Sequence, residues 1–285
     1  MKKSDRVGAL IKILSDHPNQ VFPLSYFCQL FGAAKSSVSE DIAQARRILE
    51  EWSLGRIATS PGATGGVRFL PTISDEDTRA FQETFCTKLM EPDRVLGGGF
   101  LYTADLMLDG VLMRQASQVF CRLFSDLEAD FVATIETKGI PAAFQTAQLL
   151  NIPCVVIRRE SKISEGSTVS INYFSGSQER IQKMSVSKRA VKQGSRAIII
   201  DDFMRAGGSV KGIRDMLKEF DITVVGTGIV IATTTPEKKK NDDFVPLIWL
   251  GEVDEEHKVT QAFPNRNIYA VPPVPGMTGT VALDD

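Results

Sequence analysis

One stretch decides the fold of this chain: Ile198-Ile199-Ile200-Asp201-Asp202-Phe203-Met204-Arg205-Ala206-Gly207-Gly208-Ser209. Its three branched apolar residues predict a strand that is buried on both faces, as in parallel sheets. Two carboxylates end the predicted strand, and a loop with paired glycines leads to a helix that we expect to begin near Val210. In open α/β sheets, ligands bind at such loops, outside the carboxyl ends of the strands.

The residues of this loop predict a sugar-phosphate site. Gly207 and Gly208 allow the backbone to approach a ligand closely, and the N–H groups at the start of the next helix suit a phosphate. Asp201 and Asp202 are hydrogen-bond acceptors, which fits the two hydroxyls of a ribose and a hydrated Mg²⁺ that accompanies the ligand.

Length and composition indicate a two-domain protein without a membrane segment. The chain has 285 residues, 43% of them hydrophobic, and a formal net charge of −2. No apolar run approaches the ~20 residues of a membrane helix, and the amino terminus has no apolar signal core. We therefore expect a cytoplasmic protein with four reduced cysteines. The two histidines lack ligand spacing, which argues against a zinc site and a histidine-based triad.

The first seventy residues predict a winged helix-turn-helix. The order is a helix around Val7–Leu14, a short helix over Leu24–Phe31, a third helix from about Lys35, and strands over Arg56–Ser60 and Val67–Leu70 joined by a glycine-rich loop. This order is typical of winged DNA-binding domains. Nine Lys and Arg against six Asp and Glu give this part a small basic excess.

In such a domain the third helix enters the major groove, and its amino-terminal residues face base edges and phosphates. The predicted DNA contacts are Lys35, Ser36, Ser37, Ser39, Arg46, Gly65, Gly66 and Arg68, with Arg47 as a further phosphate contact. Ser36 or Ser37 is predicted to cap the helix, and with Ser37 as the cap, Glu40 completes a capping box. The alternative is that the three helices form only a packing module.

Pro71–Ser74 reads as a linker, so we place the domains at residues 1–72 and 73–285. From Phe131 the chain alternates strands and helices, which predicts right-handed βαβ units and a mostly parallel sheet. The predicted strands are Phe131–Ile135, Pro153–Ile157, Ala197–Ile200, Thr223–Ile231 and Pro246–Leu250. The segment Ile163–Val191 predicts an extended hairpin over the site. The tail from Pro264 reads as irregular.

A second loop, Thr137-Lys138-Gly139, lies between a predicted strand and the helix opened by Pro141. Its backbone N–H groups and Lys138 predict a second anion site at the same edge of the sheet. Arg158 follows the next strand and adds positive charge there. For Arg159 and Lys162, a place in the site and a solvated position beyond the strand are equally consistent with the sequence.

The stretch Ile198–Ser209 resembles the phosphoribosyl pyrophosphate motif of type I phosphoribosyltransferases. This resemblance implies that Asp201 and Asp202 hold the ribose hydroxyls. It also implies that Phe203–Ser209 hold the 5′-phosphate and that Thr137–Gly139 hold the pyrophosphate.

Five stretches resemble the purine operon repressors of Gram-positive bacteria. They are Ala34–Asp41, Pro61–Val67, Thr137–Pro141, Glu165–Tyr173 and Asp201–Gly208. The resemblance implies an α/β protein in which a winged helix-turn-helix is joined to a type I phosphoribosyltransferase-like domain. It further implies a homodimer without catalytic activity or a catalytic cofactor, which represses purine genes at double-stranded operator DNA. Phosphoribosyl pyrophosphate would be the inducer, and guanosine tetraphosphate a competing ligand that favours repression.

Two departures from the family pattern bear on the site. Arg205 stands where the family commonly has lysine, and Phe100 stands where it commonly has an aromatic residue with a hydroxyl. A ring at Phe100 can stack in the purine slot. The alternative function is a working purine phosphoribosyltransferase with a regulatory amino-terminal domain, and a third is a nucleotide-binding scaffold without a DNA role. The divergent chain after about Thr235 carries no expectation.

Overall fold

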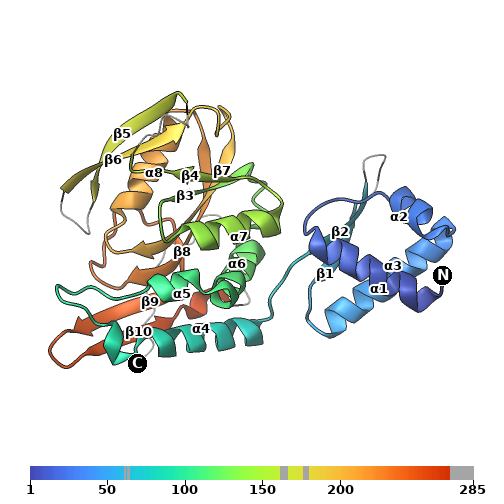
Figure 1. Ribbon diagram of the computed structural model, residues 1–285, viewed down its shortest axis with the longest axis horizontal. Coiled ribbons are helices and arrows are strands. Elements are labelled where there is room, and N and C mark those ends of the chain that lie inside the picture. The colour runs from blue at the N-terminus through green and yellow to red at the C-terminus, as the bar shows by residue number, and fades with distance from the viewer. Residues whose placement is uncertain (61, 63–64, 161–165, 176–179, 270–285) are drawn as a thin grey trace. The chain divides into compact units, whose positions relative to one another are not determined.

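The chain forms two compact units, which Figure 1 shows in a computed structural model. The first unit contains Met1–Ser74, and the second contains nearly all of the chain from Asp75 onward. The structure describes residues 1–60, 62, 65–160, 166–175 and 180–269. Part of the predicted wing loop (residues 61, 63 and 64), Lys162 and the proline-rich tail after residue 269 lie outside these ranges. None of the helices within them is both long and apolar enough to span a bilayer.

The first unit consists of three helices and a β-hairpin, in the predicted order. The helices are α1 (Lys3–Asp16), α2 (Leu24–Phe31) and α3 (Lys35–Glu51), and the antiparallel strands are β1 (Arg56–Ser60) and β2 (Gly66–Leu70). All five elements contribute to one buried core, which includes Leu10, Leu14, Phe27, Phe31, Val38, Ile42, Leu49, Ile57, Val67 and Phe69. The predicted helical domain with a hairpin is therefore confirmed.

The predicted serine cap of α3 is wrong. Gly32 ends α2 in the left-handed region at φ 58°, where its N–H bonds back to the preceding turn. Only Ala33 and Ala34 then connect the two helices, so α3 begins at Lys35 with Ala34 in the cap position and no side-chain cap. Both serines consequently lie inside the first turn of α3.

The second unit is built on a six-stranded sheet in the order β10-β9-β8-β7-β3-β4. Its strands are β3 (Phe131–Ile135), β4 (Cys154–Ile157), β7 (Arg196–Met204), β8 (Thr223–Thr233), β9 (Val245–Asp254) and β10 (Val259–Pro264). All neighbouring strands are parallel except β10, which runs antiparallel to β9. This confirms the mostly parallel sheet, although the sequence did not predict β10.

Helices cover both faces of this sheet. The helices of the second unit are α4 (Asp75–Leu89), α5 (Ala104–Leu108), α6 (Gly110–Phe124), α7 (Ile140–Leu150) and α8 (Gly208–Lys218), with short 3-10 turns at Pro92–Arg94 and Arg266–Ile268. Ile199 shares a buried cluster with Ile213 and Met216 of α8, whereas the next residue, Ile200, lies near Phe120 of α6 beside Gly228. Successive residues of β7 therefore face different helices.

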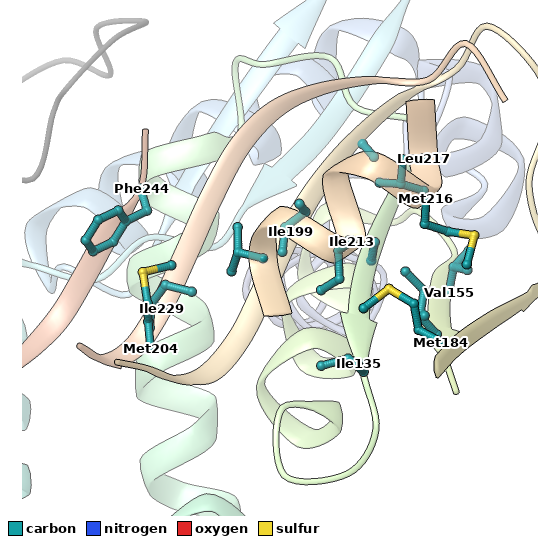
Figure 2. Close-up of a cluster of buried hydrophobic side chains, with 14 of the residues drawn as sticks. Ile135, Val155, Met184, Ile199, Met204, Ile213, Met216, Leu217, Ile229 and Phe244 are labelled. Atoms are coloured by element: carbon teal, nitrogen blue, oxygen red, sulfur yellow. The ribbon is translucent and has the colours of Figure 1, made fainter. Parts of the chain in front are cut away.

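A hairpin of β5 (Thr168–Ser175) and β6 (Arg180–Ser187), here called the arm, confirms the predicted extended hairpin. Figure 2 shows Met184 of the arm beside Val155 of β4 and near Met216 of α8, all within the same buried cluster. The arm is therefore anchored in the core of the second unit. The four cysteines are free, and burial raises the pKa of Cys86 and of Cys121 to about 12.

Candidate functional site

The two aspartates lie inside β7, and the predicted end of that strand at Ile200 is wrong. β7 continues to Met204 because β8 offers pairing partners along its whole length, with Asp201 opposite Ile229 and Met204 opposite Ala232. The loop after the strand is correspondingly short. Gly207 adopts φ 77°, which favours glycine, and α8 begins directly at Gly208 rather than near Val210.

A pocket lies at this short loop, here called the phosphate loop. It is lined by Phe203, Met204, Arg205, Ala206, Gly207, Gly208, Ser209 and Val210. The carbonyl oxygen of Ala206 accepts the Lys240 N–H at 2.9 Å. The Thr233 hydroxyl lies 2.6 Å from the Thr235 carbonyl oxygen and 3.3 Å from the Arg205 carbonyl oxygen. The first N–H groups of α8 have no partner within the helix, which suits an anion in the pocket.

The two carboxylates lie close together in a poorly hydrated place. Asp201 is 2% exposed, and its Oδ1 accepts the N–H of Asp202 at 3.1 Å. Burial raises the pKa of Asp201 well above its usual value, and the neighbouring Asp202 carboxylate raises it further. Burial also raises the pKa of Asp202, against the opposing charge of Lys138. Hydroxyl donors or a cation at this position would relieve the repulsion.

Gly139 brings the second loop into direct contact with these carboxylates. A Cβ added at Gly139 would lie 2.6 Å from the Thr134 Oγ1 and 2.7 Å from the Asp201 Oδ1, closer than side chains approach. The residue before it, Lys138, is exposed and donates to the Thr103 hydroxyl at 3.4 Å. The peptide between Glu136 and Thr137 is cis. The structure thus brings Thr137–Gly139 and Asp201 together into one site, here called the sugar-phosphate site.

The structure separates the roles of the two arginines after β4. The Glu136 carboxylate accepts the Arg159 N–H at 2.7 Å and the Arg158 Nη1 at 3.4 Å. Arg158 therefore braces the base of the second loop, and its backbone also pairs with Ser185 of the arm. Arg159, for which the sequence favoured neither role, is exposed. Burial raises the pKa of Asp201, and the positive charge of Arg159 opposes that rise.

Sequence reasoning missed Tyr173, which joins the arm to α8, because a Cβ added at Gly212 would lie 3.0 Å from the Tyr173 Cβ. Tyr173 is 7% exposed on β5 and donates its hydroxyl proton to Gln182 Oε1 at 2.7 Å. Burial raises the pKa of Tyr173. The only signal in the sequence was the position of Tyr173 inside a stretch that resembles the repressor family.

Phe100 is 53% exposed in the loop before α5. That loop is held by Glu255, whose carboxylate accepts the Gly98 N–H at 3.0 Å. Thr103, at the start of α5, is the residue that accepts a hydrogen bond from Lys138. The loop is therefore tied to the sugar-phosphate site through Thr103, and the placement of the Phe100 ring in a purine slot stays a prediction.

The exposed face of α3 in the first unit carries most of the predicted DNA-binding residues. Lys35, Ser36, Ser39 and Arg47 are exposed, and Ser37 is half-buried. Positions 35, 39, 43 and 47 are four apart and so lie on one side of the helix. Arg46 instead donates its Nε proton to the Ile57 carbonyl oxygen at 3.0 Å, so it ties α3 to β1. A bidentate contact from Arg6 to the buried Asp41, at 2.6 Å and 3.2 Å, fixes α3 against α1.

The glycines of the wing differ in role. Gly66 is buried at the start of β2, where an added Cβ would lie 2.2 Å from the Phe22 carbonyl oxygen. This burial argues against the predicted DNA contact at Gly66. Gly65 is half-buried and donates its N–H to Gly62 in the turn. Arg68 is half-buried, with an Nε that finds no hydrogen-bond partner among the residues the structure describes.

Comparison with known proteins identifies a domain family in each unit. Residues 2–71 match the amino-terminal domain of the bacterial purine repressor, and residues 112–261 match the phosphoribosyl transferase domain. Among solved structures, the chain resembles adenine phosphoribosyltransferase from Thermoanaerobacter pseudethanolicus with a TM-score of 0.50, covering 58% of this chain and 98% of that one. At 18% identity this likeness shows the fold alone.

Two full-length relatives are closer in sequence. The purine biosynthesis transcriptional repressor PurR of Bacillus subtilis is 38% identical over 257 residues, which cover 90% of each chain. The purine biosynthesis transcriptional activator PurR of Lactococcus lactis is 34% identical over 254 residues, which cover 89% of this chain and 94% of the relative. Both matches extend across both units.

Proposed function

The chain belongs to the bacterial purine repressor family, and we propose that it represses purine biosynthesis genes at double-stranded operator DNA under the control of a phosphoribosyl ligand. One observation carries this proposal: a sugar-phosphate site and a helix with an exposed face of Lys35, Ser39 and Arg47 occur in one chain. The first supplies a sensor and the second supplies a DNA-binding surface. The protein would act in the cytoplasm.

The proposed inducer is phosphoribosyl pyrophosphate. It carries a 5′-phosphate, two ribose hydroxyls and a pyrophosphate, which correspond to the phosphate loop, the Asp201–Asp202 pair and Thr137–Gly139. The separation of two anion-binding loops by two carboxylates supports this ligand, because a free nucleoside would leave both loops empty. No three His, Cys, Asp or Glu gather as a metal site in the described ranges. A Mg²⁺ would therefore arrive bound to the pyrophosphate.

Guanosine tetraphosphate is the proposed competing ligand. It also carries clustered phosphates on a ribose, so it can occupy the same two loops. Its purine needs a further surface, and Phe100 is the residue proposed for that role. A ligand that favours repression must leave DNA affinity high, whereas the inducer must lower it, so the two ligands have to stabilise different states of the protein.

The proposed DNA-binding form is a homodimer. A dimer presents two copies of α3, which suits an operator made of paired, inverted boxes. The proposed contacts are Lys35, Ser36, Ser37, Ser39 and Arg68, with Arg47 from the same face of α3. Sedimentation of the purified protein with and without an operator duplex tests this assembly.

Repression itself needs a direct test, because the Lactococcus lactis relative is named as an activator. Transcription in vitro from a purine-gene promoter should fall when the protein is added and recover when phosphoribosyl pyrophosphate follows. A rise on addition of the protein would show that it activates transcription instead.

The second candidate function is purine phosphoribosyltransferase activity, which the match of residues 112–261 to that domain favours. We propose that the chain is not an enzyme. Incubation with purine bases, phosphoribosyl pyrophosphate and Mg²⁺ should yield no nucleotide. Turnover at ordinary enzyme rates, about 1 s⁻¹ or more, would support the second candidate.

DNA binding is tested by anisotropy with a labelled purine-gene control region and an unrelated duplex of the same length. The protein should prefer the control region, and its affinity should fall steeply with salt as several phosphates are neutralised. Equal affinity for both duplexes would remove the basis for the repressor proposal.

A further inference from the structure

A buried cation with no counter-charge among the described residues lies in the segment that is hydrogen-bonded to the phosphate loop. Lys239 belongs to the segment between β8 and β9, and it is 7% exposed although exposed lysines flank it at positions 238 and 240. Its Nζ donates to the Thr233 carbonyl oxygen at 2.7 Å and to the Thr233 hydroxyl at 3.1 Å. Among the residues that the structure describes, no carboxylate forms an ion pair with Lys239.

Burying the Lys239 ammonium group without a counter-charge does not stabilise the folded state. Removing an ammonium group from water is unfavourable unless a negative charge compensates it, and an apolar side chain of similar length would fill the same space more favourably. Burial lowers the pKa of Lys239 to about 8, and the charge of Arg205 lowers it further. Lys239 therefore loses its proton, and with it its positive charge, at a lower pH than an exposed lysine does.

The contacts of Lys239 lead to the phosphate loop. The Thr233 hydroxyl, which accepts from Nζ, lies 3.3 Å from the Arg205 carbonyl oxygen. The next residue, Lys240, donates its N–H to the Ala206 carbonyl oxygen at 2.9 Å. The segment that contains Lys239 and Lys240 is thus hydrogen-bonded to the loop at Ala206, and the Thr233 that Lys239 contacts lies next to Arg205.

We propose that Lys239 is a positioning residue of the phosphate subsite. Lys239 holds the loop through Thr233, and the charge of Lys239 is compensated only when an anionic phosphate occupies the loop. This inference rests on the proposed function, because it requires a phosphate ligand. Arg205 of the loop is exposed, whereas Lys239 in the neighbouring segment is buried.

The expected pH dependence follows from linkage. An anion in the loop favours the charged lysine, so binding takes up a proton wherever the free protein has lost one. Affinity should be highest below about pH 8 and should fall as the pH rises through the pKa of about 8. Arg205 faces Lys239 from the loop, and Glu237, Lys238 and Lys240 are its charged neighbours in the same segment. Matched variants separate their contributions from that of Lys239.

The test measures the dissociation constants of ribose 5-phosphate and of phosphoribosyl pyrophosphate with Mg²⁺ by calorimetry on the full chain, from pH 7 to 9.5. Lys239→Met should weaken binding about tenfold at pH 7.5, as expected for loss of one nearby charge, and should flatten the fall at higher pH. Lys239→Arg should restore most of the affinity and also flatten the profile, because arginine keeps its charge. Lys238→Met, one position away and exposed, should behave as the wild type.

The outcomes separate this inference from the proposed function. A wild type that binds neither ligand would contradict the proposed function. A wild type that binds, together with a Lys239→Met variant of equal affinity and unchanged pH profile, would contradict only the role of Lys239. If Lys239→Met failed to fold, the arginine variant would still decide, since a wild-type pH profile in that variant overturns the inference.

Discussion

Alanine at Gly139 tests whether the two anion-binding loops form one site. The added Cβ would lie 2.6 Å from the Thr134 Oγ1, 2.7 Å from the Asp201 Oδ1 and 3.3 Å from the Asp201 Cα. A carboxylate can turn away, but the backbone of Asp201 is held in β7 by its pairing with Ile229 of β8. The loop that carries Lys138 must therefore move away from the aspartates.

The size of the effect follows from this crowding. Overpacking of a close-packed interior costs about 1–3 kcal/mol, and in a unit of this size each kcal/mol lowers the melting temperature by about 2–4 °C. The shift also separates the groups proposed to bind the pyrophosphate from those proposed to bind the ribose. We expect the affinity for phosphoribosyl pyrophosphate to fall at least about tenfold, which corresponds to about 1.4 kcal/mol.

The assay compares Gly139→Ala with Gly110→Ala, because a Cβ at Gly110 meets nothing within 4 Å. Calorimetry should show weaker ligand binding only in the first variant, and anisotropy should show that both variants bind operator DNA as the wild type does. Gly139→Ala should therefore repress without responding to the inducer. Wild-type ligand affinity in that variant would refute the single site.

Three further substitutions give separate tests. Asp201→Asn should raise the melting temperature at pH 7 by about 2–4 °C. Burial raises the pKa of Asp201, so the protonated carboxyl favours the folded state at low pH. This contribution to the free energy of unfolding falls as the pH rises from the unfolded-state pKa toward the folded-state pKa. The gain should shrink below about pH 4, and an equal gain at every pH would exclude this cause. Arg47→Ala should weaken operator binding and lower the slope of log affinity against log salt by about 1, whereas an unchanged slope would remove Arg47 from the phosphate contacts. Tyr173→Phe should weaken ligand binding several-fold in the wild type and should cause no further loss of affinity in a Ser209→Ala background. If the two losses of affinity were fully additive in this double-mutant cycle, Tyr173 would not act through Ser209.

Elements with a simple local pattern were predictable to the residue. β3 and α2 begin and end where the sequence placed them, at Phe131–Ile135 and Leu24–Phe31. Each is an apolar segment bounded by polar or turn-forming residues, so local preference and tertiary packing agree. The same holds for the order of helices and hairpin in the first unit.

Elements that depend on a partner strand were not predictable. In the sequence alone, Asp201 and Asp202 indicate the start of a loop. Only the pairing with β8 shows that β7 continues to Met204. β10 contains two adjacent polar residues, Thr260 and Gln261, and is a strand because it pairs with β9. Local sequence contains no information on these partners.

The site divides in the same way. The sequence placed three features correctly at one edge of the sheet, because each belongs to a recognisable local motif. They are Asp201, Gly207 and the second loop. Residues from separate segments are joined by the contact of Gly139 with Asp201, the packing of Tyr173 on Gly212 and the hydrogen bond from Lys240 to Ala206. These contacts decide how the site works, and only the three-dimensional structure contains them.

We propose that a ligand in the sugar-phosphate site releases operator DNA from the protein. The most direct measurement follows the anisotropy of a labelled operator duplex while phosphoribosyl pyrophosphate and Mg²⁺ are added to the wild type and to the Asp201→Ala/Asp202→Ala double variant. We predict release from the wild type and retention by the double variant. Equal release from both proteins, or no release from either, would contradict this claim.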